Sequence, residues 1–410
     1  MNTATNGRTT RSVFNPAKPG ADVKYPPETW APATRPGRSD TALTPDHRRG
    51  PASYDGFRCY RKLPAGCPPP AKLLSMDHDW LLVETLGDEP AVVAQGGSRT
   101  KNLVPITTFL RRNPHLMAIQ SAIGETVRGG QPLTSITSKH DRVIRTDVVR
   151  MSDGVIHGVQ LWIGPPDIEA PERPLIGPLK WDLDSGVATD TPESLTISGR
   201  DASREATHGR AFAEDLPAHA LNADESSVLS MVIRAKPGNV MCSTWNVTDY
   251  RGGAPIAVGF VARARREPQD DGTERLICRS MNWRAEREEP VPRPDDLPAH
   301  PRRAGDAGRP PSLVDLNSWR LLKWLDEPCP FYDWRATEVD APTLDPADEH
   351  QILSMAQEFA VGPTSRVLGL RSHDGGYTPP IHVTATRVEI DENTIAALLA
   401  LRLPTDEELA

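Results

Sequence analysis

The chain of 410 residues has few of the features that mark several large classes of protein. Its five cysteines, Cys59, Cys67, Cys242, Cys278 and Cys329, form no CxxC pair and no Cys/His ligand spacing. We therefore expect a reducing compartment, with neither a disulfide framework nor a metal site. No apolar run approaches the ~18 residues that a membrane-spanning helix needs, and the N-terminus, MNTATNGRTTRSVF, has no hydrophobic signal core. The sequence thus predicts a cytoplasmic protein with no membrane partner.

Motifs for catalysis are also missing from the sequence. It contains no Walker loop, no GxGxxG after a strand, no histidine-kinase phosphoacceptor box, no protein-kinase signature and no helix-turn-helix with a basic recognition face. No Ser/His/Asp set and no pair of carboxylates can be assigned to the expected elements as a catalytic constellation. We therefore expect no enzyme activity and no catalytic residue, and the sequence identifies no cofactor.

The charge is divided unevenly along the chain. Residues 1–75 hold twelve Lys or Arg and five Asp or Glu, a balance of +7, which leaves 35 basic and 50 acidic residues for 76–410, a balance of −15. An acidic body argues against a nucleic-acid partner. The first 75 residues also contain twelve prolines, so we expect a disordered, basic tail.

Proline-rich stretches divide the remainder into three parts. GPPDIEAPERPLIGP (164–178) and EEPVPRPDDLPAHPRRAGDAGRPP (288–311) are too rich in proline to form a helix or a central strand. We predict a tail at 1–75, a first domain at 76–165, a middle domain at 166–287, a linker at 288–311 and a C-terminal domain at 312–407.

Two of these parts contain nearly the same eight residues. DESSVLSM (224–231) and DEHQILSM (348–355) lie 124 residues apart. Each begins a stripe of apolar residues at i, i+3, i+4 and i+7, which predicts an amphipathic helix that ends at the next Gly and Pro. The first part has a weaker copy, with Asn113 as cap and Gly129-Gly130 as terminator. The repeat indicates one structural unit used three times.

Strand-like sequence follows each expected helix and turns at glycines. The turns fall at Asp153-Gly154, Gly252-Gly253 and Gly375-Gly376. Each part is also expected to open with a tryptophan-bearing strand, at Trp80, Trp181 and Trp319. The predicted fold class is α+β: three consecutive domains, each an antiparallel sheet with helices on one face.

Several stretches of the sequence indicate a particular protein family as well as a fold class. These stretches are WLLVETLGDEP, KNLVPITTFLRRNPHL, RVIRTDVVRMSDG, HGVQLWIGP, GPLKWDL, GRAFAEDLP, MNWRAE and LLKWLDEPCPFYDW. Together they resemble a mycobacterial and wider actinobacterial family of triple sensor-domain proteins, PAS–GAF–PAS in order. The resemblance covers residues 76–407 and implies PAS/GAF-like domains. It implies no ligand and no output, because that family has no assigned function.

The richest candidate surface is WRLLKWLDEPCPFYDW (319–334). An aromatic cluster in the strand and following loop of such a domain could line a ligand pocket or dock a partner, and the alternative is ordinary core packing. Elsewhere, Cys242, His350 and His382 are read as structural or solvent-facing residues. The candidate ligand or partner residues are Trp319, Trp324, Cys329, Phe331, Tyr332 and Trp334.

The opening strands differ in which faces are apolar. Leu179, Trp181 and Leu183 alternate with charged residues, which predicts a middle sheet with a solvated back. In the first strand Leu82 opposes Leu81, and in the third Leu322 and Trp324 oppose Leu321. Both faces of these two strands should therefore be covered, by a neighbouring domain, a second copy or an effector.

These observations favour a non-catalytic sensory or regulatory protein. It would bind a small ligand or a protein partner and signal to a separate effector protein in trans, with a homodimer as one possible state. The alternative is a protein-interaction scaffold with filled cores and no small-molecule ligand. A small-molecule enzyme with an unrecognised site is a third and weaker interpretation.

Overall fold

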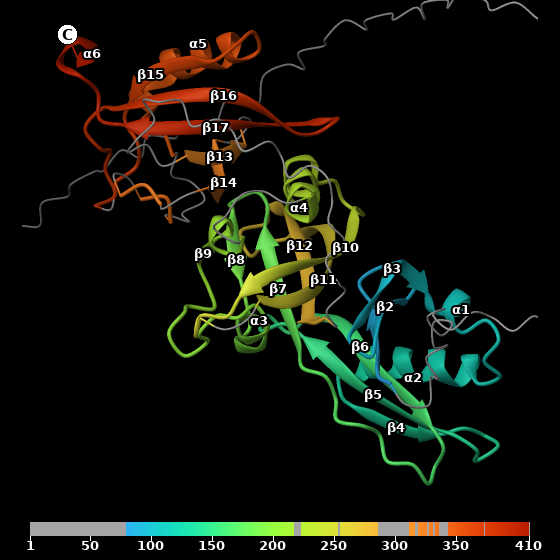
Figure 1. Cartoon of the computed structure of the whole chain (residues 1–410). Helices are drawn as coiled ribbons and strands as arrows, with labels where there is room; N and C mark the ends of the chain where they lie inside the picture. Colours follow the sequence, from blue (N-terminus) through green and yellow to red (C-terminus); the bar gives the residue numbers. More distant parts are fainter. Residues whose placement is uncertain are drawn as a thin grey trace, which may run out of the picture. The chain divides into compact units, whose positions relative to one another are not determined.

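A computed structural model describes residues 79–216, 223–252, 255–285, 311–315, 319–325, 328–330, 333–335, 343–372 and 374–409. The predicted tail and almost all of the predicted linker lie outside these residues. Within the compact unit Pro70–Ala410, the described residues form three antiparallel sheets, each the basis of a sheet-dominated domain with few helices (Figure 1). The α+β architecture is therefore confirmed.

The first domain has a six-stranded sheet in the order β3-β2-β1-β6-β5-β4. Helix α2 packs its buried residues Ile119, Ala122 and Ile123 against the sheet. It ends at Gly130, which has φ +62 and donates its amide to the carbonyl of Thr126, as the glycine pair predicts. The elements are β1 (Leu81–Glu84), β2 (Ala91–Gln95), β3 (Ser98–Pro105), α1 (Ile106–Phe109), α2 (Leu116–Gly129), β4 (Leu133–Ile136), β5 (Val143–Arg150) and β6 (Ile156–Gly164).

The middle domain has a six-stranded sheet in the order β10-β11-β12-β7-β8-β9. The long β11–β12 hairpin forms its centre, and α4 packs Val228 and Leu229 into the core of the domain. The elements are β7 (Ile176–Asp182), β8 (Val187–Thr189), α3 (Pro192–Ile197), β9 (Arg210–Ala211), η1 (Phe212–Glu214), α4 (Ala223–Arg234), β10 (Val240–Thr248), β11 (Pro255–Pro268) and β12 (Glu274–Arg284).

The C-terminal domain has a five-stranded sheet in the order β14-β13-β17-β16-β15. It opens with β13, whereas the sequence predicts the strand of Trp319 as the first. The short β13 begins at Pro311, the second of two adjacent prolines, so its apolar pattern is hidden by the linker composition. The elements are β13 (Pro311–Asp315), β14 (Arg320–Trp324), η2 (Pro346–Asp348), α5 (Glu349–Phe359), β15 (Thr364–Leu368), β16 (Ile381–Asp391), β17 (Thr394–Arg402) and α6 (Asp406–Leu409).

The two halves of the sequence repeat both form helices, α4 and α5, as predicted. Asp345 caps the turn that leads into α5, with its side chain accepting from the amide of Ala347 at 2.9 Å. The predicted cap of α4, Asn222, lies outside the described residues. The meanders that follow pair as β10·β11 and β15·β16, antiparallel.

The back of the first sheet is covered by the middle domain. Leu82 shares one apolar cluster with Met281 and Trp283 of β12, whereas Leu81 and Val83 lie in the first domain's own core. The expected cover over Leu82 is therefore confirmed. The expected solvated back of the middle sheet is wrong along β11 and β12, because Val261, Met281 and Trp283 on that face pack with residues of the first domain.

Strand β14 carries a β-bulge that changes which side chains share a face. Leu313 pairs with Lys323 and Val314 pairs with Leu321, so Leu322 is the extra residue. Trp324 consequently packs in the domain's own core with Leu321, while Leu322 joins the cluster of the middle domain. The prediction that Leu322 and Trp324 share the back of the sheet is wrong for Trp324.

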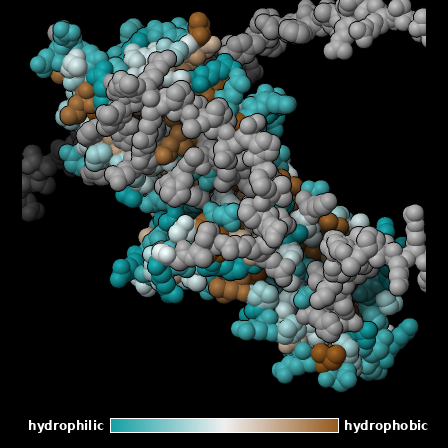
Figure 2. All heavy atoms as spheres, in the orientation of Figure 1, coloured by the Kyte–Doolittle hydropathy of each residue, from teal (hydrophilic) through white to brown (hydrophobic). Residues whose placement is uncertain are grey.

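The large apolar side chains that remain exposed are scattered. Met117 is 75% exposed, Leu353 59% and Val361 93%. On the face that Figure 2 shows, the brown apolar spheres form small separate groups among teal ones. Single exposed apolar residues of this kind are common on folded proteins, so the candidate site is sought in the interior.

Candidate functional site

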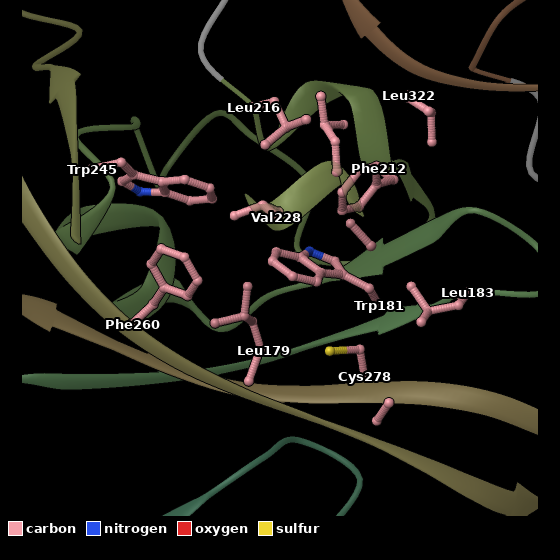
Figure 3. Packing of buried hydrophobic residues seen from close by; sticks show 14 of the residues in the cluster. Leu179, Trp181, Leu183, Phe212, Leu216, Val228, Trp245, Phe260, Cys278 and Leu322 are labelled. Carbon is pink, nitrogen blue, oxygen red and sulfur yellow. The ribbon is translucent and has the colours of Figure 1, made fainter. Parts of the chain in front are cut away.

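The core of the middle domain contains a ring of aromatic side chains. Trp181 comes from β7, Trp245 from β10 and Phe260 from β11, and Figure 3 shows the three rings around one space with Val228 of α4 between the two indoles. The rings of Trp245 and Phe260 have centroids 4.5 Å apart. We call Trp181, Trp245 and Phe260 the aromatic cage.

A cavity of about 20 Å³ lies against the aromatic cage. This volume holds about one water-sized group. Apolar and polar groups share its lining, so it differs from a purely hydrophobic packing defect. The other lining residues are Leu179, Asp190, Leu195, Ser198, Arg200, Asp215, Ser280 and Asn282.

Two carboxylates of this lining share one buried guanidinium. Arg210 Nη1 lies 2.5 Å from Asp190 Oδ2 and 2.7 Å from Asp215 Oδ1, and all three side chains are buried. The indole of Trp181 donates to Asp215 Oδ2 at 2.7 Å. Burial together with the charge of Asp215 raises the pKa of Asp190 to about 7, against the opposing charges of Arg210 and of Arg200, which also lines the cavity.

Asp190 is connected to Asn282 through a buried serine. Ser194 Oγ donates to Asp190 Oδ1 at 2.8 Å, and Asn282 Nδ2 donates to Ser194 Oγ at 3.0 Å. Asn282 Oδ1 and Trp245 Nε1 are buried and have no hydrogen-bond partner. The lining of the cavity thus holds one acceptor and one donor that a bound group could satisfy.

Buried charges also join the first domain to the middle domain. Glu84 of β1 is 1% exposed and accepts two hydrogen bonds from Arg263 of β11, at 2.7 and 3.0 Å. Arg279 of β12 binds Glu267 through two hydrogen bonds and lies 3.0 Å from Asp153 of the first domain. Paired, bidentate geometry of this kind offsets the cost of burying the ions.

His157 of β6 lies at the centre of that joint. Its Nδ1 is 2.8 Å from the Ser280 carbonyl and its Nε2 is 3.1 Å from Arg279 Nη1. Because the guanidinium can only donate, Nε2 accepts and Nδ1–H donates to the carbonyl. Burial, with the Arg279 charge, lowers the pKa of His157 to about 4. For Asp153, burial acts against ionisation, but hydrogen bonds from Arg279 and Lys180 outweigh it and hold the pKa at about 2.

A fully buried ion pair joins the middle and C-terminal domains. Lys323 Nζ of β14 lies 2.8 Å from Glu225 Oε2 of α4, with side-chain exposures of 0% and 2%. Burial lowers the pKa of Lys323, against the opposing effect of Glu225. Arg320 also donates to the carbonyls of Leu183 and Asp184, and Arg335 Nε lies 2.7 Å from Glu214 Oε1.

The predicted candidate residues gather in the core of the C-terminal domain. Trp324 is 3% exposed and Cys329 1%, and Trp319 and Trp334 pack against the same cluster. The indoles of Trp324 and Trp334 meet edge to face at 5.9 Å. Phe331 and Tyr332 lie outside the described residues. The four described residues line neither the cavity at the aromatic cage nor a second cavity of about 20 Å³ between Leu82 and Trp283.

Within the described part of the chain, no group of three or more His, Cys, Asp and Glu side chains could hold a metal ion. Burial raises the pKa of the Cys278 thiol to about 12. It also raises the pKa of Cys242 to about 11, against the opposing charge of Arg99. Thiols of this kind are unreactive at neutral pH.

The buried charges are the residues that sequence reasoning missed. Lys323 stands between Leu322 and Trp324, His157 follows Ile156 in β6, and Arg279 follows Cys278 in β12. The available signal was a single charged residue inside an apolar run, which alternation rules assign to a solvent face. Only the neighbouring domain makes these positions interior.

Comparisons with known proteins agree with the three-domain organisation. Family models match residues 79–172 (Rv3651-like, N-terminal), 175–285 (Rv3651-like, middle domain) and 303–410 (Rv3651-like, C-terminal domain). No curated protein matches the chain.

Among solved structures, an uncharacterized protein from Mycobacterium tuberculosis is 57% identical, with a TM-score of 0.71 over 81% of this chain and 98% of that one. A sensory box histidine kinase/response regulator from Burkholderia thailandensis is 12% identical, with a TM-score of 0.20 over 27% of this chain and 76% of that one. The second likeness is too low to support any argument.

No helix among the described residues is both long and apolar enough to cross a membrane. The three family models together match well over half of the chain, each on a different sheet domain. The chain therefore belongs to the Rv3651-like family.

Proposed function

We propose that this chain is a non-catalytic, cytoplasmic regulatory protein whose domains are PAS-, GAF- and PAS-like in order. The middle domain receives a signal, α4 passes it to the C-terminal domain, and that domain acts on a separate effector protein. Each of the three sheets has five or six antiparallel strands, which is the support for the PAS/GAF assignment.

The observation that carries the proposal is the position of α4. One face of this helix places Val228 among the rings of the aromatic cage. Another part of it holds Glu225 in the buried pair with Lys323 of β14. Because a buried ion pair cannot be loosened cheaply, a shift of α4 at the cage has to be followed by β14. The helix therefore couples the cage to the C-terminal sheet.

Hydrogen exchange on the full chain tests this coupling. The variant Phe260→Leu alters the cage without touching the C-terminal domain, and we expect faster amide exchange in β13, β14 and β17 as well as in α4. In a Glu225→Leu/Lys323→Met background the same change should have a smaller effect on the C-terminal sheet, because only the apolar contacts of α4 then remain. If Phe260→Leu in the otherwise wild-type chain leaves the rate of amide exchange in the C-terminal sheet unchanged, the coupling is ruled out.

The second candidate is a protein-interaction scaffold with filled cores. It is favoured by the small size of the two cavities, about 20 Å³ each. Native mass spectrometry of the chain purified from an actinobacterial host separates the two functions. A bound small molecule supports the regulatory protein, and a bare chain with a co-purifying protein supports the scaffold.

A further inference from the structure

Helices α4 and α5 are two copies of one sequence repeat, but only α4 is covered on its outer face. Glu225 of α4 corresponds to Glu349 of α5, and Leu229 corresponds to Leu353 at the same spacing. Glu225 is 1% exposed and Leu229 is 0% exposed. In α5, Leu353 is 59% exposed and Glu349 is exposed as well. The same two residue types are therefore buried in the middle domain and open to solvent in the C-terminal domain.

Both helices bury their other face in the domain to which they belong. Val228 of α4 lies among the rings of the aromatic cage. Its counterpart in α5, Ile352, packs with Met355 against the core cluster of the C-terminal domain, and Figure 1 shows α5 along β15 and β16. Glu349 and Leu353 are four residues apart, so they share a helix face. Their exposure shows that this face is turned away from the domain's own core.

The cover over α4 indicates which kind of surface the repeated face accepts. Lys323 of β14 lies 2.8 Å from Glu225 Oε2. Leu229 belongs to the same apolar cluster as Leu322 of β14 and Val388 of β16. Helix α4 therefore docks against a sheet that offers a lysine amine beside aliphatic side chains.

The exposure of Leu353 is informative because of the repeat. An exposed leucine alone is common on folded proteins, but the equivalent leucine of α4 is fully buried. One turn away, Glu349 has no ion-pair partner among the residues that the structure describes. The next position on this face is Gln357, where α4 has Ile233, so the apolar part of the face is confined to the first turns of the helix.

We propose that Glu349 and Leu353, together called the α5 face, dock onto the effector protein through a sheet that presents a lysine beside aliphatic side chains. The inference rests on the proposed function, which supplies the effector, and names the surface that the effector contacts. A second copy of the chain does not fit, because its matching sheet surface around Lys323 is already covered by its own α4. The effector's lysine pairs with Glu349, and the aliphatic side chains cover Leu353.

A photo-cross-linking amino acid at position 353 tests the proposal in cells. The full chain with p-benzoylphenylalanine in place of Leu353 is expressed in an actinobacterium whose own gene for an Rv3651-like chain has been deleted. We expect a cross-link to one other protein, at a strand in which a lysine is flanked by apolar residues. The matched control carries the same amino acid in place of Met117, a 75% exposed residue of α2, and should not cross-link to that protein.

Charge reversal distinguishes this docking from accidental proximity. Glu349→Lys should lower the yield of the cross-link at position 353 by about tenfold or more, because like charges across an interface repel. Replacing the partner's lysine at the cross-linked strand with glutamate should restore the yield. The control Glu392→Lys, at another exposed carboxylate of the C-terminal domain, should leave the yield unchanged. The substituted side chains of this chain are all exposed, so the variants should keep the wild-type melting temperature.

Three results would each overturn the proposal. They are a cross-link at position 353 no stronger than at position 117, a cross-link to a second copy of the chain, and a yield that Glu349→Lys leaves unchanged. None of them affects the coupling from the cage to the C-terminal sheet, because the Phe260→Leu exchange experiment measures the chain alone. Loss of that coupling, with the cross-link at position 353 intact, would leave the α5 face standing and remove the proposed route of the signal.

Discussion

Lys323 is the most deeply buried charged side chain at the two domain boundaries. The free-energy cost of burying its charge is offset by the ion pair with Glu225. Its amine is 2.8 Å from Glu225, and both side chains are almost fully withdrawn from water. Removing Glu225 leaves the Lys323 amine buried without this carboxylate, which is far more costly than replacing both residues with apolar ones.

We predict that Glu225→Leu lowers the free energy of unfolding by about 3–5 kcal/mol, because it leaves the buried Lys323 without its carboxylate. The double variant Glu225→Leu/Lys323→Met should recover most of that loss, since no unpaired ion remains. Urea unfolding of the full chain gives both values. If the single variant is as stable as the wild type, the pair is not buried in solution.

His157 gives the first–middle joint a predictable dependence on pH. Its pKa is lowered to about 4 in the folded chain, whereas in an unfolded chain it is about 6.5. The unfolded chain therefore binds a proton first as the pH falls. The stability contributed by neutral His157 is complete above about pH 6.5 and is lost down to about pH 4, roughly 3 kcal/mol in all.

The variant His157→Gln keeps a donor and an acceptor but cannot titrate, so it should remove this part of the pH dependence. Asp190 acts with the opposite sign, because its raised pKa contributes stability that is lost as the pH rises through about 7. The difference between wild type and His157→Gln in matched buffers isolates the histidine. Parallel stability curves from pH 7 to pH 4 would contradict the assignment.

At the scale of elements, β6 approaches the middle sheet at a glycine. A Cβ on Gly158 would lie 2.5 Å from the Val83 carbonyl oxygen and 2.7 Å from Met281 Sδ. Contacts this short require both the backbone of β1 and the Met281 side chain of β12 to move, or β6 itself to shift. Gly158 thus sets how closely the first and middle sheets can pack.

We predict that Gly158→Ala destabilises the chain by about 1–3 kcal/mol through overpacking. The matched control is Gly129→Ala, at a helical position with no atom within 4 Å of the new Cβ, where alanine should stabilise α2 by about 0.5–1 kcal/mol. Thermal unfolding of the two variants tests both signs. Equal melting temperatures would mean that the sheets do not approach at Gly158.

The elements that sequence predicts well are those defined by local chemistry. Helices α4 and α5 follow from a repeated apolar stripe, and the end of α2 follows from Gly130. The face assignments in β14 fail because one extra residue, Leu322, reverses the alternation. A bulge is set by the pairing partner, which local periodicity does not contain.

The candidate site shows the same division. The residues that line the cavity at the aromatic cage come from strands and loops between residues 179 and 282, and no local spacing brings them together. The aromatic run at 319–334 was the more visible signal, yet its described members pack in the C-terminal core. Likewise, Glu225 and Glu349 occupy equivalent positions of the repeat, but Glu225 is buried and Glu349 exposed.

At the scale of the whole chain, the middle domain shares apolar clusters with both neighbours. Val261, Met281 and Trp283 pack with residues of the first domain. Leu313, Leu322 and Val388 of the C-terminal domain belong to the middle domain's own core cluster. Folding of each domain is therefore linked to that of the next by apolar burial and by paired ions.

We predict one cooperative unfolding transition for all three domains by scanning calorimetry of the full chain. The variant Trp283→Ala removes the largest side chain of the first–middle cluster and should separate the first domain's transition from the rest. The control Val361→Ala, at a 93% exposed position, should leave a single transition. Three resolved peaks in the wild type would show that the domains fold independently.

The shared clusters also determine which parts of this family could be exchanged to make chimeras. A middle domain taken from a relative would bring its own partner for Leu82 on one side and for Leu322 on the other, and both would have to match at once. A first or C-terminal domain needs to match at one joint only. We therefore expect chimeras with an exchanged first or C-terminal domain to fold, and chimeras in which only the middle domain is exchanged to be unstable.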